Sequence, residues 1–406
     1  MNCRACDSKL NLTFLDLGTS PIANNLVDIE KLNRQSMSFP LHAMTCENCA
    51  LVQLSEVIPK EILFPANYNY FSSFSSSWLE HSKTFAEKIT TFLDLNENDL
   101  VVEIASNDGY LLQFFQNNHI QVMGIEPAAG VANTAIIKGI PTTIDYFGVA
   151  TAERLARLKK PKLMIGNNVL AHVPDLHDFI KGFSILIDDE GIITFEFPHL
   201  LNLIINNQFD TIYHEHYSYL SITALLPIFA KYDLKIINIE KLSTHGGSLR
   251  IFLAKNISNW TVNESVLNTI YEESKLDPRD PRIYQSMHIR ANKIKKDLLA
   301  RLIEFKKAGK RIAAYGAAAK GVTLLNYCGI GKDLIDYVVD LNPNKQGKFL
   351  PGSLIPVVDI KALNTNPPDV LFILPWNLSL EIKSQLSTLI ESGMQTMRAI
   401  PKVELF

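Results

Sequence analysis

The sequence predicts an α/β protein in which a small N-terminal module precedes two units that alternate strands with helices. Three observations support this fold class. Apolar strand-like runs alternate with helical segments between residues 99 and 197, and the same alternation returns from about residue 288. The first 65 residues instead carry two closely spaced cysteine pairs. A chain of 406 residues has room for about two to three domains, and we expect them at residues 1–65, 66–254 and 255–406.

The charge balance excludes several classes of protein as default interpretations. There are 39 Lys and Arg residues against 42 Asp and Glu, a net charge of −3, which argues against a strongly basic nucleic-acid binder or a polybasic membrane protein. No apolar run reaches the ~20 residues needed to span a bilayer, and the first residues lack the apolar core of a signal peptide. We expect a cytoplasmic monomer without nucleic-acid or membrane partners.

The N-terminal module contains four of the five cysteines, in two C-x2-C pairs. Such a pair directs both thiolates at one ion, and two pairs complete a closed tetrahedral site. All four positions are cysteine, so we expect a structural Zn²⁺ rather than a catalytic one. A redox C-x-x-C pair and four unrelated thiols are the alternatives. The expected metal ligands are Cys3, Cys6, Cys46 and Cys49, and Cys328 is expected to be a buried packing residue.

The elements that follow the module can be assigned in order. A helix is expected near residues 78–93, a buried strand at 99–106 and a helix near 109–117. Further strands are expected at 121–127, 162–168 and 191–197, and a turn-rich linker region at 255–285. The second alternating unit begins with a basic helix at about 288–308 and continues with strands at 311–318, 334–340 and 369–375. This alternation predicts parallel, doubly wound sheets.

The loop after the strand 99–106 is the candidate cofactor loop. A dinucleotide site requires G-x-G-x-x-G, but Tyr110 would occupy the third glycine position and prevent close packing of helix and strand. The acidic-x-G-x-G-x-G loop of S-adenosylmethionine enzymes fits better, although two of its three glycines are replaced. Its signature positions are taken by Glu103, Ala105, Asn107 and Gly109. The alternative is an ordinary α/β turn with no ligand.

Two neighbouring strands complete the expected cofactor site. The strand 121–127 ends in Glu126 and Pro127, and a carboxylate at that position can accept hydrogen bonds from both ribose hydroxyls. The strand 162–168 ends in Asn167 and Asn168, which we add to the cofactor-binding residues. A surface glutamate without a ligand is the alternative for Glu126.

The densest group of titratable and hydroxyl side chains lies at residues 210–219, beyond the end of a predicted strand, where open α/β sheets bind ligands. A metal site built on His214 and His216 would lack the i, i+4 spacing of a zinc-binding helix. Structural histidines are a second interpretation. The third is general acid–base chemistry, in which Glu215 tunes a histidine and Tyr213 holds a carbonyl oxygen. His172 would face the same crevice, although a lone histidine there is more often a wall residue than a base.

Taken together, these motifs resemble the sugar C-methyltransferases, which add a C-3 methyl branch in tetronitrose or evernitrose biosynthesis. The resemblance covers essentially the whole chain. Its motifs are LGTSPIANNL at 17–26, VEIASNDGYLL at 102–112, NNVLAHVPD at 167–175, IYHEHYSYLS at 212–221, HGGSLRIF at 245–252, and the segments at 315–357. It implies a zinc-binding module, a central class I S-adenosylmethionine methyltransferase domain with a Rossmann-like fold, and a Rossmann-like C-terminal domain that helps to hold a nucleotide sugar.

The resemblance also implies roles for the candidate catalytic residues. In the family, a Y-x-E-H motif faces the methylated carbon, and here it corresponds to Tyr213, Glu215 and His216; Tyr68 and His172 match further active-site positions. A base removes the C3 proton beside a C4 ketone, and the resulting enolate accepts the methyl group. We expect His216 to be the base and Glu215 to orient it or raise its basicity, with Tyr213 and His172 contacting the carbonyl oxygen or a sugar hydroxyl. The expected substrate is a dTDP- or GDP-linked 4-keto-6-deoxy sugar.

The C-terminal unit carries the expected site for the diphosphate of that substrate. The segment 315–321 follows a strand and opens a helix, where backbone N–H groups can bind an anion. The alternative is a duplicated α/β scaffold without a ligand. The expected substrate-binding residues are Tyr315, Gly316, Ala317, Lys320, Asp340, Asn342, Lys345 and Gln346.

Three other functions remain open on the sequence. Methylation at C5 of a similar sugar uses the same chemistry. An NAD-dependent nucleotide-sugar dehydrogenase or epimerase is disfavoured by Tyr110 and by the absence of G-x-G-x-x-G at 315–321. A non-catalytic zinc adaptor is disfavoured by the side-chain cluster at 210–219.

Overall fold

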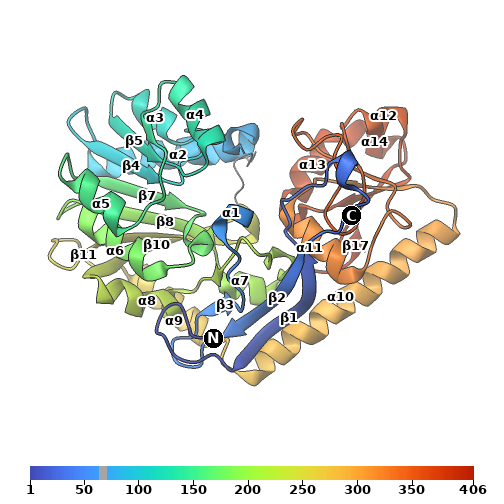
Figure 1. Ribbon diagram of the computed structural model, residues 1–406, viewed down its shortest axis with the longest axis horizontal. Coiled ribbons are helices and arrows are strands. Elements are labelled where there is room, and N and C mark those ends of the chain that lie inside the picture. Colours follow the sequence, from blue (N-terminus) through green and yellow to red (C-terminus); the bar gives the residue numbers. More distant parts are fainter. Residues whose placement is uncertain (64–70) are drawn as a thin grey trace.

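The computed structural model describes residues 1–63 and 71–406 and contains three sheets (Figure 1). The smallest has the order β1-β2-β3-β9. Its strands are β1 (Leu12–Pro21), β2 (Ser38–Thr45), β3 (Val52–Leu54) and β9 (Ser218–Tyr219), and the short helix α1 (Lys60–Leu63) follows β3. The strand β9 comes from the central region, so the N-terminal module is completed by a segment far away in the sequence.

The central sheet has seven strands in the order β10-β11-β8-β7-β4-β5-β6. Its first strand, β4, lies between parallel partners β5 and β7, and β11 runs antiparallel to both β8 and β10. The strands are β4 (Leu100–Ile104), β5 (Gln121–Ile125), β6 (Thr142–Thr143), β7 (Leu163–Asn167), β8 (Ile192–Pro198), β10 (Leu234–Leu242) and β11 (Ser248–Lys255). This is the predicted Rossmann-like domain, with carboxyl ends of β4, β5 and β7 at one edge.

Helices cover both faces of the central sheet, which explains why its strands are buried runs rather than alternating ones. One face packs against α2 and α3, and the other against α6 and α8. The helices of this region are α2 (Ser76–Leu93), α3 (Leu112–Gln116), α4 (Ala129–Ile137), α5 (Val149–Ala156), α6 (Leu176–Leu186), α7 (Leu200–Ile205), α8 (Ile222–Lys231) and α9 (Glu264–Ser274).

The C-terminal sheet has six strands in the order β14-β13-β12-β15-β16-β17, all parallel except the last. Its strands are β12 (Ile312–Tyr315), β13 (Tyr337–Val339), β14 (Val357–Val358), β15 (Val370–Ile373), β16 (Gln395–Arg398) and β17 (Glu404–Leu405). Its helices are α10 (Pro281–Lys307), α11 (Ala319–Cys328), α12 (Ala362–Thr365), α13 (Ser379–Gln385) and α14 (Ser387–Glu391). The predicted second Rossmann-like fold is confirmed.

The predicted linker at 255–285 is wrong. Helix α9 lies within it and packs against β10, and α10 begins at Pro281. The Asp280 side chain accepts a hydrogen bond from the Arg282 N–H, and proline at the first helical position lacks the N–H that would have no partner. The Asp-Pro pair therefore starts a helix here instead of breaking one. The domain boundaries themselves stay predictions.

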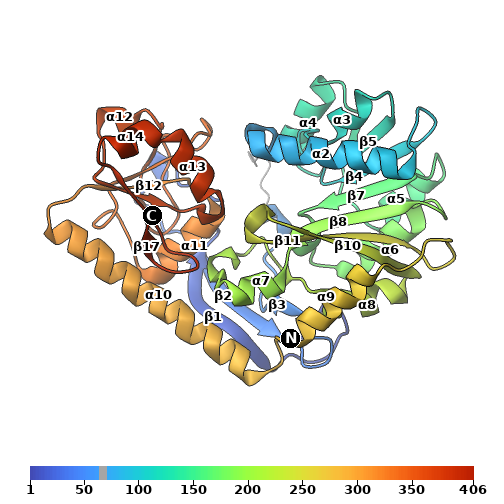
Figure 2. The ribbon, with the colours of Figure 1, turned by 180° about the vertical axis from the view of Figure 1, so that it is seen from behind.

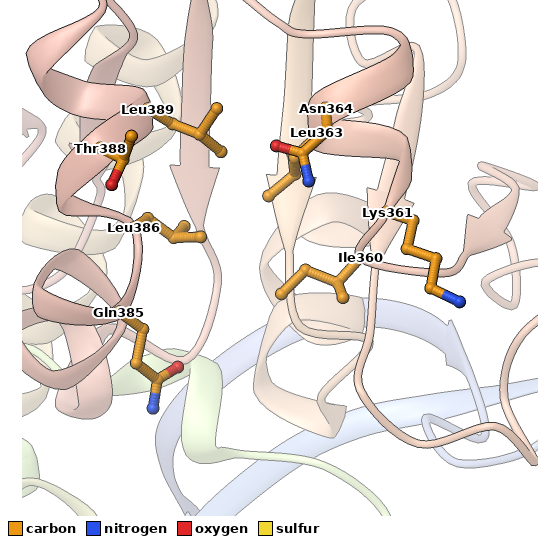
Figure 3. Close-up of a pocket in the computed structure, with 8 residues that line it drawn as sticks. All are labelled: Ile360, Lys361, Leu363, Asn364, Gln385, Leu386, Thr388 and Leu389. Carbon is orange, nitrogen blue, oxygen red and sulfur yellow. The ribbon is translucent and has the colours of Figure 1, made fainter.

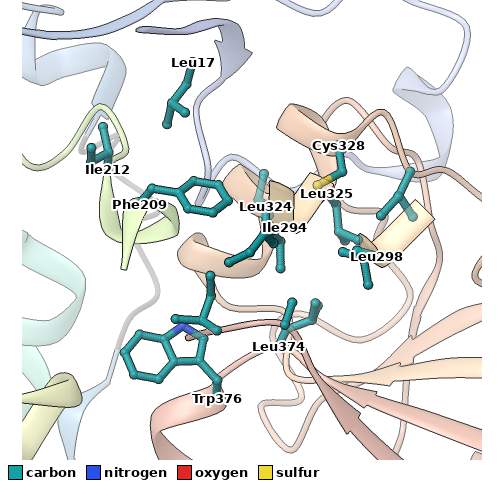
Figure 4. Packing of buried hydrophobic residues seen from close by; sticks show 14 of the residues in the cluster. Leu17, Phe209, Ile212, Ile294, Leu298, Leu324, Leu325, Cys328, Leu374 and Trp376 are labelled. Carbon is teal, nitrogen blue, oxygen red and sulfur yellow. The ribbon is translucent and has the colours of Figure 1, made fainter. Parts of the chain in front are cut away.

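One apolar cluster joins the N-terminal sheet, the α7 segment of the central region and the C-terminal sheet. Leu17 of β1 packs in the same cluster as Phe209 of the central region and Leu298 of α10 (Figure 4). Cys328 is 2% exposed and belongs to this cluster, which confirms its expected packing role. Figures 1 and 2 show β1 and β2 running from the central region to the C-terminal one, beside the long helix α10. Among residues 1–63 and 71–406 we find no helix with the length and apolar content that crossing a bilayer requires.

Candidate functional site

The four cysteines of the N-terminal module form one cluster. Cys3 Sγ lies 3.5 Å from Cys49 Sγ, Cys6 Sγ lies 3.5 Å from Cys46 Sγ, and all four sulfurs lie within 4.8 Å of one another. Sulfurs bound tetrahedrally to zinc at ~2.3 Å are roughly 3.8 Å apart, so the cluster fits a structural Zn²⁺. In the described parts of the chain no other group of three or more His, Cys, Asp or Glu side chains could hold a metal, which overturns the metal interpretation of His214 and His216.

The thiols of the cluster interact with one another in this structure. Cys3 and Cys49 share a hydrogen bond in which either sulfur could be the donor, and this contact lowers the pKa of the Cys3 thiol. A divalent cation at the centre would stabilise all four thiolates.

Arg4 connects the metal cluster to the candidate catalytic segment. Its guanidinium donates to the Tyr217 carbonyl at 2.8 Å and to the Leu54 carbonyl at 2.9 Å. The strand β9 begins directly after Tyr217, so the metal-binding turn holds the end of the Y-x-E-H segment in place.

The cofactor loop keeps the conformation of a glycine-rich loop despite its substitutions. Ala105 has φ 57°, Asn107 has φ 52° and Gly109 has φ 77°, so all three signature positions are left-handed. Glycine adopts this conformation most readily and asparagine tolerates it, whereas alanine pays about 1–2 kcal/mol. A Cβ at Gly109 would lie 2.2 Å from Ile140 Cδ1, so a larger residue at the third position would collide with α4's following segment.

Glu126 fixes this loop to the next strand. Its Oε2 accepts the Asn107 N–H at 3.0 Å, and its Oε1 accepts the Ala128 N–H at 2.8 Å. Burial raises the pKa of this carboxyl group, while the two backbone N–H groups lower it. Each oxygen keeps a further lone pair, so the expected contact with ribose hydroxyls is compatible with this geometry.

Several buried polar atoms at this edge have no hydrogen-bond partner among the described residues. They are Glu103 Oε2, Ser106 Oγ, Asn167 Oδ1 and Asn168 Oδ1, at the carboxyl ends of the adjacent strands β4 and β7. Burial raises the pKa of Glu103 well above its usual range. Each unpaired buried group costs about 1–3 kcal/mol, so this edge fits a ligand rich in donors and acceptors such as S-adenosylmethionine. All eight predicted cofactor residues, Pro127 included, lie at or just beyond the carboxyl ends of β4, β5 and β7.

A segment from before α2 covers the loop. The Ser72 N–H donates to Asn107 Oδ1 at 2.9 Å, and the Ser73 hydroxyl donates to Asp108, which also binds Lys138 at 3.1 Å. These contacts were not predicted. Tyr68, the remaining predicted catalytic residue of this part of the chain, lies outside the described residues.

His216 is held in a defined tautomer. Its Nδ1 lies 2.9 Å from the Thr211 carbonyl oxygen, which can only accept, so Nδ1 carries the proton and Nε2 is the acceptor. Nε2 lies 2.8 Å from the Tyr213 hydroxyl. Burial, followed by the nearby His172, lowers the pKa of His216 well below its ordinary value, so the ring is neutral at neutral pH. A neutral imidazole with an unprotonated Nε2 is the form that a general base requires.

Glu215 does not have the expected role. Its Oε1 accepts a hydrogen bond from Asn24 at 3.0 Å, and the groups that position His216 are Thr211 and Tyr213. The segment between the 3₁₀ turn at Phe209–Thr211 and β9 is irregular, so neighbouring side chains point in different directions. Burial raises the pKa of Glu215 to about 6. This carboxyl group therefore links the Y-x-E-H segment to the N-terminal module.

The other two histidines of the prediction differ in position. The His172 ring lies 4.8 Å from that of His216, and burial lowers the pKa of His172 to about 4. His172 thus belongs to the cluster as expected. His214 is buried, and its Nε2 donates to the Pro40 carbonyl at 3.2 Å, so it packs against β2 instead.

The cluster extends to His245, which the sequence prediction had named only within the HGGSLRIF motif. His245 has φ 53° and is followed by two glycines with positive φ, a strained segment that brings its ring within electrostatic reach of His216. The ring lies 5.5 Å from that of Trp78. Burial, followed by the charge of Lys320, lowers the pKa of His245 to about 4.

A charged network supports the cluster from β8, and the prediction missed it as well. Glu196 is fully buried and accepts from Arg250 at 2.7 Å and from His81 at 2.9 Å. The Thr244 hydroxyl donates to the same carboxylate at 2.9 Å. These residues lie far apart in the sequence and share no spacing, so no local pattern indicated them.

The predicted diphosphate site is largely satisfied by its own contacts. Asp340 accepts the Ala317 N–H at 2.7 Å and the Asn342 N–H at 2.8 Å. The Lys345 ammonium donates to the Ala317 carbonyl at 2.8 Å, and the Gln346 amide donates to the Asp340 carbonyl at 2.9 Å.

Three other predicted residues of this loop are placed differently. Tyr315 packs into the apolar cluster on one face of the C-terminal sheet. A Cβ at Gly316 would lie 2.7 Å from Pro375 Cδ. Lys320 donates to Asn377 Oδ1 at 2.6 Å, in the turn after β15, and its ammonium interacts electrostatically with Asp210 of the central region. The structure therefore brings Ala317, Asp340, Asn342, Lys345 and Gln346 together and separates Tyr315 and Lys320 from them.

A pocket of about 250 Å³ lies elsewhere in the C-terminal region, between α12 and the α13–α14 segment (Figure 3). None of the predicted site residues lines it. Its lining residues are Ile360, Lys361, Leu363, Asn364, Gln385, Leu386, Thr388 and Leu389.

Comparisons with known proteins agree with this arrangement. Three family models match the chain: a putative zinc binding domain at residues 3–64, a methyltransferase domain at 78–239 and a C-methyltransferase C-terminal domain at 243–401. The C-methyltransferase NovU of Streptomyces niveus is 32% identical over 401 residues, which cover 98% of this chain and 95% of NovU.

Two solved methyltransferase structures are also similar to parts of the chain. An S-adenosylmethionine-dependent methyltransferase from Anabaena variabilis shares 11% identity with a TM-score of 0.38, over 47% of this chain and 89% of that one. The magnesium protoporphyrin IX methyltransferase of Synechocystis PCC 6803, with bound S-adenosylmethionine, shares 16% identity with a TM-score of 0.32, over 44% of this chain and 81% of that one.

Proposed function

This chain belongs to the zinc-containing C-methyltransferase family that includes NovU, and we propose that it methylates C3 of a nucleotide-linked 4-keto-6-deoxy sugar. It is an S-adenosylmethionine-dependent C-methyltransferase with a structural zinc site. The dehydrogenase and the non-catalytic adaptor considered from the sequence are therefore wrong. The sugar, the carbon and the nucleotide are the parts that we propose.

The observation that carries the proposal is the geometry of His216. Its Nδ1 proton is committed to the Thr211 carbonyl, so Nε2 carries the basic lone pair, which accepts the Tyr213 hydroxyl and is released to a substrate proton when that hydroxyl turns to the substrate. Carbon methylation needs such a base because a sugar C–H is not acidic by itself. A ketone on the adjacent carbon makes the proton removable, since the resulting anion is an enolate. A well-placed base supplies on the order of 10²–10⁴-fold in rate.

The chain's own residues account for the remaining parts of the step. His216 Nε2 takes the C3 proton, and the Tyr213 hydroxyl and His172 contact the C4 oxygen or a neighbouring hydroxyl as charge develops. Glu103, Asn107, Glu126, Asn167 and Asn168 would hold S-adenosylmethionine, which supplies an electrophilic methyl carbon.

The substrate would lie between the two Rossmann-like regions, and its diphosphate would replace the contacts that Asp340 and Lys345 make with Ala317 in this structure. A dTDP- or GDP-linked sugar suits this proposal. We also propose that the enzyme is a cytoplasmic monomer; in the cytoplasm the four cysteines stay reduced and free to bind a metal.

Mass spectrometry tests the proposal. The zinc-loaded enzyme is incubated with S-adenosylmethionine and either dTDP-4-keto-6-deoxyglucose or GDP-4-keto-6-deoxymannose, and we expect one sugar to gain one methyl group. His216→Asn should abolish the product, whereas His288→Asn, which changes an exposed histidine of α10, should not. NMR of the product then locates the methyl group. Methylation at C5, the other carbon beside the ketone, would replace the C3 assignment, and no product with any ketosugar would contradict the proposal.

A further inference from the structure

Lys320 lies at the catalytic cluster rather than in the diphosphate loop. Its ammonium donates to Asn377 Oδ1 at 2.6 Å and lies 4.7 Å from the ring centre of Trp376. The Trp376 indole N–H in turn donates to Asp210 at 2.7 Å, at the start of the segment that leads to His216. A Cβ at Gly246 would lie 2.4 Å from the Trp376 ring, so this ring is packed directly against the segment that carries His245.

The charged groups around Lys320 agree with this placement. After burial, the positive charge of Lys320 is the next largest cause that lowers the pKa of His245, and it also lowers the pKa of His216, after burial, His172 and His245. Burial lowers the pKa of Lys320 itself to about 8, although the facing Asp210 carboxyl group raises it. Burial raises the pKa of Asp210 to about 7. Lys320 is therefore a cation near neutral pH, with the two histidines and Asp210 as its titratable neighbours.

A cation beside a general base is unfavourable by itself. When His216 takes a proton, the imidazolium is repelled by the ammonium of Lys320, and this repulsion slows proton removal. The arrangement becomes favourable only if a negative charge develops between the two groups at the same moment. Proton removal next to a ketone creates that charge on the ketone oxygen.

We propose that Lys320 is a catalytic residue that donates a hydrogen bond to the C4 oxygen of the ketosugar as C3 loses its proton. This inference rests on the proposed function. In the step, the C3–H bond breaks and its proton goes to His216 Nε2. The electron pair forms the C3–C4 double bond, and the C4–O π pair moves to the oxygen, which accepts the Lys320 N–H. No oxidant, reductant or further reactant is needed.

The diphosphate contact expected for Lys320 from the sequence is the competing assignment. The loop that would bind the diphosphate has its Ala317 N–H occupied by Asp340 and its Ala317 carbonyl occupied by Lys345. Lys320 takes part in neither contact. The two assignments predict different kinetics, because a diphosphate contact acts on the bound substrate and on the transition state alike, whereas a contact to the enolate oxygen acts in the transition state.

The test uses the full-length, zinc-loaded enzyme with Lys320→Met and Lys320→Arg. Proton removal is followed by NMR as deuterium uptake at C3 of the 4-keto-6-deoxy sugar in D2O, without S-adenosylmethionine. We expect Lys320→Met to slow exchange and kcat by about 10²–10³-fold, the usual loss for one oxyanion donor, with little change in KM. The matched control is Lys306→Met, which removes a partly exposed ion pair with Asp336 in the same region and should change neither value.

The pH dependence of the exchange rate is a second test, because a purely structural role of Lys320 would leave it unchanged. Because the Lys320 ammonium is lost above its pKa of about 8, the wild-type exchange rate should fall above that pH. Lys320→Arg should restore part of the rate and remove this alkaline limb, since a guanidinium stays protonated.

Each outcome decides between the assignments. A raised KM with unchanged kcat in Lys320→Met would assign Lys320 to the diphosphate, and an unchanged exchange rate would also overturn the inference while leaving the proposed function intact. If the wild-type enzyme exchanges no ketosugar, the proposed function is wrong, and the role of Lys320 is wrong with it. Circular dichroism of Lys320→Met checks that a lost rate does not reflect a lost fold.

Discussion

In both the central and the C-terminal Rossmann-like regions, an acidic residue holds the first loop by accepting two backbone N–H groups. In the central region, Glu126 at the end of the second strand accepts N–H groups from Asn107 and from Ala128 two residues further on. In the C-terminal region, Asp340 takes the equivalent position and accepts N–H groups from Ala317 and from Asn342, again two residues further on. The acidic residue thus connects adjacent strand ends in both regions.

The two regions differ in the polar atoms that surround the acidic residue and its loop. The central loop leaves the polar atoms Glu103 Oε2 and Ser106 Oγ buried without a partner, whereas between residues 312 and 346 only the Tyr315 hydroxyl is in that state. In the C-terminal loop, Pro375 fills the space beside Gly316. The difference teaches that a shared topology does not indicate a ligand, and that unsatisfied buried polar groups do.

The largest effect should follow removal of the metal, because the N-terminal sheet supports both regions through the shared core. Zinc binding to such sites is worth on the order of 10 kcal/mol of folding free energy, so chelation or Cys46→Ser should lower Tm sharply and abolish activity. Calorimetry with measurement of zinc content checks this. Cys328→Ala is the control and should keep the zinc. An unchanged Tm in the metal-free protein would show that the two regions are stable without the module.

A smaller effect should appear at Asp210, which joins the two regions through Trp376. Burial raises the pKa of this carboxyl group from 3.8 to about 7, so its contribution to stability is complete below pH ~4 and is lost as the pH rises through 7. The loss is of the order of 4 kcal/mol. Asp210→Asn keeps an oxygen for the indole N–H and should lack this loss. Urea unfolding at pH 5 and pH 8 measures the difference, with the exposed Asp297→Asn as control; parallel profiles for wild type and Asp210→Asn would contradict it.

The comparison of the two loops is tested directly by Glu126→Gln and Asp340→Asn. Each variant replaces a carboxylate that accepts two N–H groups, and hydrogen bonds to charged groups contribute about 1.5–3 kcal/mol. We expect Glu126→Gln to weaken S-adenosylmethionine binding by about 10- to 100-fold, and Asp340→Asn to lower stability without changing that affinity. Isothermal titration calorimetry measures the affinity. Equal losses of affinity in both variants would mean that both loops contribute to S-adenosylmethionine binding.

The smallest expected effect is on the free energy of unfolding, and it concerns the first position of each loop: Ala105 in the central region and Gly316 in the C-terminal region. Ala105 has φ 57°, so Ala105→Gly relieves strain, and we expect the free energy of unfolding to stay the same or rise by up to about 1 kcal/mol. Gly316 has φ 88° and lies against Pro375, so Gly316→Ala should lower stability. Chemical denaturation checks both signs, and a clear loss of stability in Ala105→Gly would be the contrary result.

The sequence predicted the central strands well because they are uniformly apolar runs between helical segments. The structure places β4 at Leu100–Ile104 and β7 at Leu163–Asn167, within two residues of the expected bounds. Strand β9 has two residues and no pattern of its own; it exists because β3 offers it an open edge. Helix α9 was missed because its apolar positions are few, and it is stabilised by packing on β10.

The candidate site was predictable where one segment carries several reactive side chains, as at residues 210–219. The orientations of the side chains in the site were not predictable, because they depend on partners that are distant in the sequence. Glu215 is directed to Asn24 and Lys320 to Asn377, and neither partner has a spacing that indicates the contact. Glu196 was missed because a single acidic residue in an apolar strand gives no indication of the Arg250 that it binds.

The completion of the N-terminal sheet by β9 limits how this family can be recombined. A breakpoint placed between the module and α2, where the family models also divide the chain, would combine β1, β2 and β3 from one parent with the β9 of another. The hydrogen bonds from Arg4 to the Tyr217 carbonyl and from Asn24 to Glu215 would then have to form between segments of different parents. Chimeras with new sugar specificity should therefore inherit the module together with the Y-x-E-H segment, and exchange the region after β11 instead.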